Sequence, residues 1–192
     1  MNKTRLEAFS DAVIAIIMTI MVLELKIPHG EDLESLQPLI PVFLAYVLSF
    51  IYLAIYWNNH HHMLQATRTV NGKVLWGNML LLFWMSMIPF TTGWMGENHF
   101  APVPTAVYGV NLLLCAVSYM LLQNKLAHHA GSENALLAEA VGSDLKGKIS
   151  MVIYIIAVPL AFVGYHISHA LYATVALMWL VPDRRIEKRI SQ

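Results

Sequence analysis

The sequence contains few charged residues and a single cysteine. Only 12% of its 192 residues are Asp, Glu, Lys or Arg, whereas 57% are hydrophobic, and the mean hydropathy is +0.56. Soluble domains carry about 25% charged residues, so this composition predicts an integral membrane protein. The formal net charge is zero, which gives no general attraction to nucleic acid. Cys115 stands alone, so the chain cannot form an internal disulfide.

The sequence also lacks the motifs of common enzymes and nucleotide-binding proteins. It has neither a G-x-S-x-G element nor a glycine-rich phosphate loop. Nine histidines invite a metal interpretation, but His60, His61 and His62 are consecutive and would point three ways on a helix. His166 and His169 offer only two ligands. We therefore predict no enzymatic activity, no cofactor and no metal site, and we interpret the histidines as hydrogen-bonding partners of neighbouring helices.

Long apolar stretches predict an all-α integral membrane protein with six transmembrane helices in a single domain, 1–192. We expect these helices at about 4–26, 35–63, 69–94, 104–126, 148–164 and 167–181. The last two are short for a span, which takes about 20 residues, and a tight turn near Gly164 would join them as a hairpin. Pro89 is expected to bend the third helix near its outer end. No internal repeat is visible, so any symmetry has to come from oligomerisation.

Basic residues are distributed unevenly between the two predicted membrane faces. With six spans, one face has only Lys26, and the other collects Lys3, Arg5, Arg68, Lys73, Lys125, Lys146, Lys148, Arg184, Arg185, Lys188 and Arg189. Cytoplasmic loops of membrane proteins carry an excess of Lys and Arg. The asymmetry therefore predicts that both termini are cytoplasmic.

The first predicted helix carries a distinctive stripe. Thr4 and Glu7 fit a capping box at its start, and the body from Ala12 to Leu23 is apolar except for Thr19. Ala12, Ile16, Thr19 and Leu23 step by four, three and four residues and therefore share one helix face. In several copies around an axis, apolar rings can close a pore by dewetting, and a hydroxyl ring can replace part of an ion's hydration shell. Spacing alone favours the more common use of such a stripe, which is packing between helices.

The inner end of the same helix is polar. Arg5, Ser10 and Asp11 fall near the inner membrane face, at the same level as the histidines at 60–62. Polar side chains at membrane depth need partners, and Asp is too short to reach far toward the headgroups. We therefore predict a polar network that ties the first helix to the second and third.

At this point the residues match a known pattern. Arg5, Phe9, Ser10 and Asp11, followed by AVIAIIMTIMVLEL, resemble the signature of the endosomal and lysosomal potassium channel family and its bacterial homologues. YWNNHHHM at 56–63 and LLLFWMSMIPFTT at 80–92 are similar to further segments of that family. These channels lack the TVGYG selectivity filter. The resemblance covers the first half of the chain closely, together with the six-span plan of the whole.

The resemblance implies a homotetramer of six-helix units whose pore is lined by the first helix. It places the narrow apolar constriction at Ile16, the hydroxyl layer linked to potassium preference at Thr19, and an upper hydrophobic layer at Leu23. It also implies a set of residues that brace the first helix against the second and third. This set consists of Arg5, Phe9, Ser10 and Asp11, with His61 and Trp76 as candidate partners.

We therefore predict a potassium-selective or potassium-preferring cation channel that conducts passively and lies in the bacterial inner membrane. Its partners would be copies of itself, the lipid bilayer and K⁺, which passes near Thr19. Two other functions fit the residues as well. One is a proton-coupled secondary transporter that uses Asp11 and the histidines as a proton relay. The other is a non-conducting membrane scaffold in which the stripe on the first helix is buried between helices.

Overall fold

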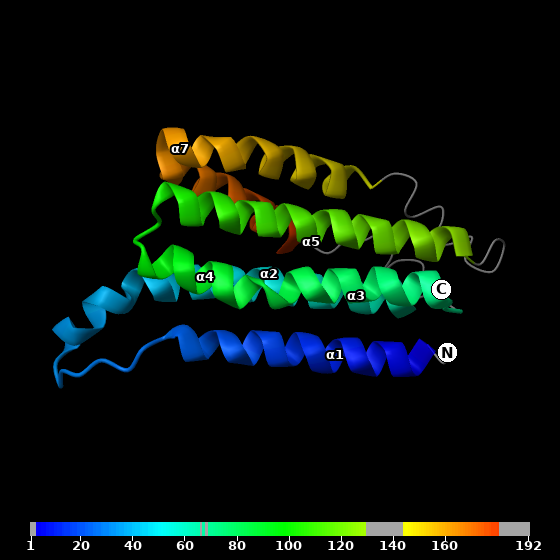
Figure 1. Ribbon diagram of the computed structural model, residues 1–192, viewed down its shortest axis with the longest axis horizontal. Helices are drawn as coiled ribbons and strands as arrows, with labels where there is room; N and C mark the ends of the chain where they lie inside the picture. The colour runs from blue at the N-terminus through cyan, green and yellow to red at the C-terminus, as the bar shows by residue number, and fades with distance from the viewer. Residues whose placement is uncertain (1–2, 66, 68, 130–143, 181–192) are drawn as a thin grey trace.

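The computed structural model describes residues 3–65, 67, 69–129 and 144–180 (Figure 1). Within these ranges all regular structure is helical, which confirms the predicted all-α class. Arg68 and the basic residues at 184–189, which contribute to the predicted orientation, lie outside the described residues, as does the end of the sixth predicted helix. The helices are α1 (Lys3–Ile20), α2 (Ile40–Gln65), α3 (Gly72–Ser86), α4 (Ile88–Glu97), α5 (Pro102–His129) and α7 (Leu145–Leu180), with short 3₁₀ segments at Met21–Glu24 and Leu33–Leu39.

Five helical stretches of the described part are long and apolar enough to cross a membrane. They are Lys3–Glu24, Leu33–Gln65, Gly72–Glu97, Pro102–Ala127 and Leu145–Leu180. The first two include the 3₁₀ segments, so α1 continues directly into Met21–Glu24. Asp32 starts the second stretch, because its side chain accepts a hydrogen bond from the backbone N–H of Ser35 at 3.1 Å.

The third stretch is divided into α3 and α4. The α3 helix begins at Asn71, whose side chain caps the N–H of Val74, and it ends at Ser86. Pro89 occupies the first turn of α4 and has no N–H to donate to the preceding turn. The sequence predicts a bend at this proline, and the structure shows a helix boundary at Met87 instead.

The last stretch, α7, folds back on itself at Gly164, where the backbone leaves the helical region (φ −169°, ψ 100°). The two legs, 145–163 and 165–180, form a hairpin that covers one side of α5 (Figure 1). Ser168 on the second leg donates a 2.7 Å hydrogen bond to the carbonyl of Ala157 on the first. One continuous stretch therefore supplies two passes across the molecule.

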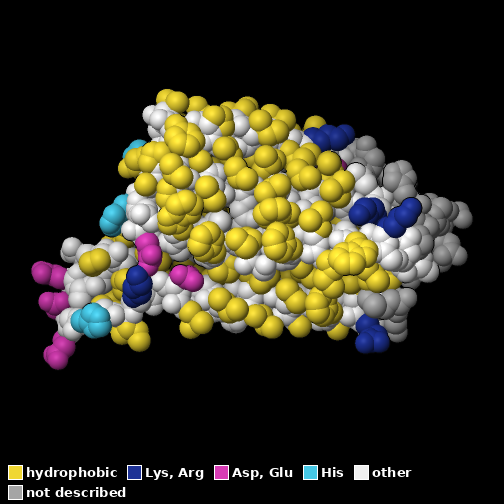
Figure 2. Space-filling model, in the orientation of Figure 1, with side chains coloured by type: hydrophobic (Ala, Val, Ile, Leu, Met, Phe, Trp, Pro, Cys, Tyr) yellow, Lys and Arg dark blue, Asp and Glu magenta, His cyan; other side chains and the backbone are white. Residues whose placement is uncertain are grey.

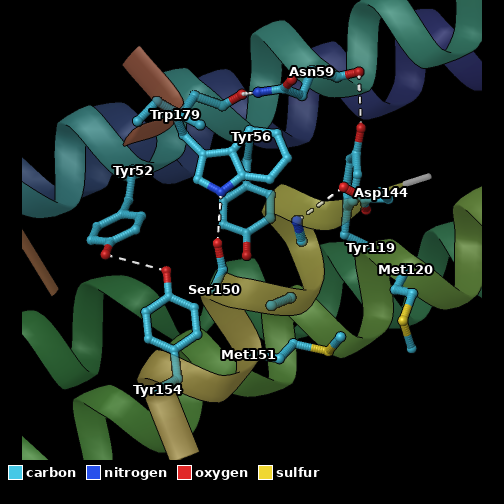
Figure 3. A pocket seen from close by; sticks show the side chains of 13 residues that line it. Tyr52, Tyr56, Asn59, Tyr119, Met120, Asp144, Ser150, Met151, Tyr154 and Trp179 are labelled. Atoms are coloured by element: carbon cyan, nitrogen blue, oxygen red, sulfur yellow. Dashed lines mark hydrogen bonds between the residues drawn. The ribbon is translucent and has the colours of Figure 1, made fainter. Parts of the chain in front are cut away.

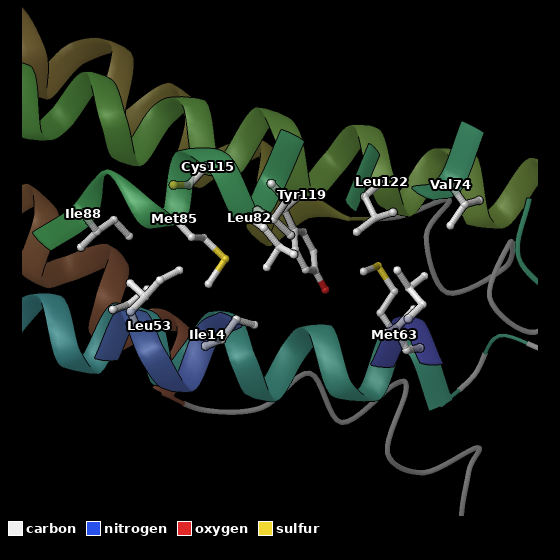
Figure 4. Close-up of a cluster of buried hydrophobic side chains, with 14 of the residues drawn as sticks. Ile14, Leu53, Met63, Val74, Leu82, Met85, Ile88, Cys115, Tyr119 and Leu122 are labelled. Carbon is white, nitrogen blue, oxygen red and sulfur yellow. The ribbon is translucent and has the colours of Figure 1, made fainter. Parts of the chain in front are cut away.

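The helices are stacked so that α1 lies at one edge of the molecule and α7 at the other (Figure 1). Between α1 and α5, an apolar core is formed by side chains from α1, α2, α3 and α5 (Figure 4). Ile14, Leu53, Met85 and Leu122 are fully buried in it. Because α1 has neighbours on one side only, its opposite side remains uncovered within a single chain.

Charged side chains gather at the two ends of the molecule. On the face shown in Figure 2, most Asp and Glu side chains lie at the end that carries the connection between α1 and α2. Lys and Arg side chains lie mostly at the other end, where α1 begins, and apolar side chains cover the middle. This is the surface that a chain crossing a bilayer several times requires.

Candidate pore helix and its bracing contacts

The packed face of α1 is set by residues spaced three or four apart. Leu6, Ser10, Ile14, Ile17 and Met21 are all buried against α2, α3 and α4. Positions with this spacing form one stripe along the helix, so the remaining sides of α1 project away from the other helices. Burial of this stripe fixes the rotation of α1 about its own axis.

The stripe predicted to face the pore lies on the uncovered side of α1. The side chain of Ile16 is 55% exposed and that of Leu23 is 76% exposed, and Thr19 is exposed between them. A step of about 100° per residue places Thr19 almost opposite Ser10 and Ile17. A single chain therefore presents two large apolar side chains and one hydroxyl on the face of α1 that its own helices do not cover.

The Thr19 hydroxyl is oriented by its own helix. Its oxygen lies 3.0 Å from the carbonyl of Ala15 and 2.9 Å from that of Ile16, and the hydroxyl donates its proton toward them. The oxygen keeps its lone pairs, which point away from the helix backbone. The side chain can thus accept a hydrogen bond from water or contribute an oxygen to a cation.

A groove runs between α1 and α4 beside this stripe. Ile16 and Ile20 line it from α1, and Phe90 and Trp94 line it from α4. At its outer end lies Glu24, together with Glu97 and Gly93. The groove is apolar in its middle and acidic at one end, so any helix that fills it has to present an apolar face.

Two contacts hold the outer end of the first span. The Glu24 carboxylate lies against Gly93, where a side chain of even one carbon would meet its oxygen at 2.7 Å. Beyond the helix, Lys26 forms an ion pair with Glu97 at 2.5 Å. The hydrogen bond from Lys26 to this carboxylate raises the pKa of the Lys26 ammonium above its ordinary value. The loop after α1 is thus attached to the end of α4.

A buried polar chain joins α1 to α3 and α2 near the other end. Ser10 accepts a 2.9 Å hydrogen bond from the side-chain amide of Asn78 on α3. The Asn78 carbonyl oxygen in turn lies 2.7 Å from Nε2 of His60 on α2. All three side chains are at most 1% exposed.

The direction of these bonds identifies the donor nitrogen of the histidine. Because the Asn78 oxygen can only accept, Nε2 of His60 carries the hydrogen of this bond. Nδ1 is buried and has no hydrogen-bond partner among the described residues. Ser10 completes the chain by donating to the carbonyl of Leu6 at 2.8 Å.

Two further contacts surround this buried chain. Trp57 on α2 donates a 3.1 Å hydrogen bond from its indole nitrogen to the carboxylate of Asp11. His61 Nδ1 lies 3.5 Å from the carboxylate of Glu7, and its ring stacks on that of Trp57. Together with the Ser10 chain, these contacts tie the first half of α1 to both α2 and α3.

The structure brings together only some of the residues predicted to brace α1. Ser10 and Asp11 contact α3 and α2 directly, and His61 contacts α1 through Glu7. Phe9 is 46% exposed, Arg5 is exposed, and Trp76 is 77% exposed on the outer side of α3. Trp76 and Asn78 are two positions apart, about 200° around the helix, so the two cannot face α1 together.

Three contact residues were missing from the predicted set. His60 and Asn78 form the buried chain, and Trp57 holds Asp11. A sequence signal existed for two of them. Asn78 interrupts the apolar middle of a predicted helix, and His60 is the first of three adjacent histidines. Trp57 carried no such signal, because tryptophans near helix ends are common membrane-interface anchors.

A second cavity lies on the other side of the molecule from α1. It is a narrow space between α2, α5 and α7, and Figure 3 shows its aromatic walls. Its polar groups are largely paired with one another. Trp179 donates to Ser150 at 2.8 Å, and Tyr154 donates to Tyr52 at 3.2 Å. These pairs link α2 to the two legs of α7, so the walls of this cavity serve as part of the frame behind α1.

Comparison with known proteins is consistent with this geometry. The family model of the endosomal/lysosomal potassium channel TMEM175 matches residues 5–89, which include α1 and its contacts on α2 and α3. A potassium channel from Chryseobacterium sp. (strain P1-3) is 50% identical over 192 residues, covering 100% of both chains. The endosomal/lysosomal proton channel TMEM175 of Danio rerio is 30% identical over 120 residues, which is 60% of this chain and 22% of that protein.

A solved structure shares the same architecture. The crystal structure of a lysosomal potassium-selective channel TMEM175 homologue from Chamaesiphon minutus superimposes with a TM-score of 0.78. That protein is 27% identical to this one, and the match covers 93% of this chain and 96% of the other. Three findings agree with one another. They are the 50% identity to a bacterial relative over its full length, the family match over the first half of the chain, and the shared architecture. The chain is therefore a multi-pass membrane protein that belongs to the TMEM175 family of ion channels.

Proposed function

We propose that the chain, 1–192, is one unit of a homotetrameric, potassium-preferring cation channel that conducts passively through a pore lined by α1. Ile16 forms the constriction, Thr19 a hydroxyl layer and Leu23 an upper apolar layer. K⁺ is the permeant ion, and conduction requires no cofactor. The relatives from Chryseobacterium sp. and Chamaesiphon minutus are named as potassium channels, which supports this choice of ion.

The observation that carries the proposal is the uncovered stripe on α1. The large apolar side chains of Ile16 and Leu23 lie on the face of α1 that the rest of the chain leaves open. From Ile16 to Leu23 the helix rises by about 10 Å. Four such stripes around an axis would form two apolar rings with a hydroxyl ring between them. This arrangement explains why α1 packs against its own helices on one side only.

The chemistry of these rings favours potassium over sodium. An ion loses hydration in an apolar ring unless the ring is wide enough to keep some water. The oxygen of Thr19, whose proton is directed toward its own helix backbone, can replace part of the lost hydration. K⁺ holds its water less tightly than Na⁺ does, so partial dehydration costs K⁺ less.

The charge distribution supports the orientation. The described lysines at the end where α1 begins are Lys3, Lys73, Lys125, Lys146 and Lys148, and the acidic connection at 31–34 lies at the other end. Under the positive-inside rule, this arrangement puts the start of α1 in the cytoplasm. We assign the protein to the bacterial inner membrane on the same basis and on its similarity to bacterial relatives.

The test is an ion-flux measurement on purified protein in liposomes. With a K⁺ gradient and a K⁺-free control, we expect passive K⁺ flux above that of empty liposomes and a smaller flux when Na⁺ replaces K⁺. Flux that does not saturate with concentration distinguishes a channel from a transporter. Absence of flux at every voltage would leave the non-conducting scaffold as the better description.

Proton permeation is a second candidate, because the Danio rerio relative is named a proton channel. A pH-sensitive dye inside the same liposomes measures it directly. In this chain, Asp11 already accepts a hydrogen bond from Trp57, which favours a bracing role over a proton relay. Acidification that follows an imposed proton gradient, at a rate above that of K⁺ movement, would make H⁺ the preferred ion.

A further inference from the structure

One lysine at the basic end of the molecule differs from the others in its surroundings. Lys3 donates to the carbonyl of Gln65, Lys146 donates to that of Met178, and Lys73 and Lys148 are exposed to solvent. Lys125, on α5, is half-buried, yet no acceptor for its ammonium lies within hydrogen-bonding distance among the described residues. Its ammonium can therefore pair with an anion from outside this part of the chain.

Gly77 explains how Lys125 comes to lie there. The Lys125 side chain crosses α3 at this glycine, so that a carbon added to Gly77 would lie 3.2 Å from Cδ and 3.6 Å from Nζ. Leu122, one turn earlier on α5, would lie 3.6 Å from the same added carbon. The stem of Lys125 thus packs on the α3 backbone, and its ammonium is held close to α3 rather than free in solvent.

Two other side chains extend this site along α3. Lys73 precedes Gly77 by four positions and therefore lies on the same face, one turn nearer the start of the helix. Trp76 is adjacent to Gly77 and is 77% exposed, although tryptophan is among the most apolar side chains of the helix. Exposed tryptophans in membrane proteins sit at the level of the lipid headgroups, where the ring is apolar and the N–H can donate.

The depth of the site matches a headgroup. Gly77 is five residues into α3, about 7.5 Å along the helix axis from its first residue. Lys73 is then at the aqueous edge, and Lys125 lies about one turn deeper, beside the apolar surface that begins at Met79 and Leu80.

We propose that Lys125, Lys73 and Trp76 form a binding site for the phosphate of an anionic phospholipid from the leaflet at this end of the protein. Lys125 and Lys73 supply two ammonium groups, and the indole of Trp76 lies along the upper part of the acyl chains. The site is distinct from the face of α1 proposed to line the pore, and it does not depend on which ion the channel conducts.

Native mass spectrometry of the purified full chain tests this assignment. The protein is equilibrated in micelles with equal amounts of phosphatidylglycerol and phosphatidylcholine, and the lipids that remain bound are counted. We expect phosphatidylglycerol to be retained preferentially. Lys125→Gln should lower this preference by about fivefold, the change expected from one lysine near an anionic headgroup. Lys125→Arg, which keeps the charge, should preserve it.

Lys148→Gln is the matched control, because Lys148 is an exposed lysine at the same end but on α7. We expect this variant to leave the preference unchanged. An equal loss in both variants would mean diffuse attraction to the whole basic surface and would overturn the site. An unchanged preference in Lys125→Gln would overturn it as well, since the counter-charge would then come from protein.

Two further measurements distinguish a lipid site from a site for soluble anions and cover a variant that fails to fold. Excess inorganic phosphate should not displace the bound lipid, and displacement would identify a site for soluble anions instead. Should Lys125→Gln fail to give folded protein, Lys73→Gln carries the same test, because Lys73 is exposed and its removal disturbs no packing. An unchanged lipid preference in Lys73→Gln would then refute the assignment.

Discussion

The buried chain from Ser10 through Asn78 to His60 predicts a measurable coupling between α1 and its frame. The perturbation is a double-mutant cycle of Ser10→Ala and Asn78→Ala. Removal of the Asn78 amide breaks its bonds to both partners and leaves the buried Nε2–H of His60 without an acceptor. Removal of the Ser10 hydroxyl breaks the bond to Asn78 and the local bond to the carbonyl of Leu6.

The magnitude follows from the number of bonds that each variant loses. Hydrogen bonds between helices of membrane proteins contribute about 0.6 kcal/mol on average, and up to about 1.7 kcal/mol. Asn78→Ala breaks two of these and leaves buried polar atoms unpaired, so we expect a loss of about 1–3 kcal/mol in the free energy of unfolding. Ser10→Ala should cost about 1 kcal/mol. The coupling energy between the two variants should be about 0.6–1.7 kcal/mol, because the bond they share can be lost only once.

Reversible unfolding in mixed detergent micelles, followed by helical circular dichroism, measures these free energies. Asn98→Ala is the control, because the Asn98 amide is exposed and donates to the carbonyl of Trp94, four residues earlier in the chain. We expect this variant to change stability by less than about 0.5 kcal/mol. Additive losses for Ser10→Ala and Asn78→Ala, with no coupling, would show that the two side chains do not act together, and the account of how α1 is braced would be wrong.

Other substitutions test the pore stripe and the packing of the frame. Ile16→Asn should wet the constriction and raise K⁺ flux several-fold in liposomes, whereas unchanged flux would remove Ile16 from the pore wall. Thr19→Ala should lower the K⁺ to Na⁺ permeability ratio by up to about fivefold, the effect of losing one interaction of about 1 kcal/mol, as measured from reversal potentials. An identical ratio would make the hydroxyl layer irrelevant. Gly96→Ala should destabilise the fold by about 1–3 kcal/mol, because the added carbon would lie 2.7 Å from the backbone Cα of Val42 on α2. Gly72→Ala is its control, since no atom lies within 4 Å of the added carbon and stability should be unchanged or slightly higher in the same unfolding assay.

The helices themselves could be predicted from the sequence, because a bilayer demands long apolar stretches and leaves few alternatives. The interruption near Pro89 could also be predicted, because proline lacks the N–H that a continuous helix needs. The exact place where α3 ends could not be derived. It depends on how Met87 and Ile88 pack against neighbouring helices, and Ile88 is fully buried in that core.

The rotation of each helix was harder to predict than its existence. α1 has one clearly apolar stripe and one polar end, and at that end Ser10 contacts α3 and Asp11 contacts α2. α3 is apolar on nearly every side, so its sequence does not reveal which face turns inward. Trp76 was accordingly expected to face α1, whereas Asn78 does so.

For the same reason, the sequence does not reveal which of the three adjacent histidines faces inward. Neighbouring residues on a helix point about 100° apart, so only one of three can face a given partner. His60 faces inward and is 1% exposed, and His61 meets Glu7 at the surface of α1. Only the rotation of α2 within the assembled fold decides between them, since His60 meets Asn78 of α3 and His61 meets Glu7 of α1.

The single cysteine of the chain has a practical consequence. Cys115 lies on α5 within the core that backs α1, and it is fully buried (Figure 4). Water-soluble maleimides and methanethiosulfonates react with thiolates that they can reach, so this position should be silent in the folded protein. A spin label or fluorophore attached through a thiol engineered anywhere on the surface would therefore report from one site per chain. Distances between identical labels in an assembled oligomer could be measured without first removing the native cysteine.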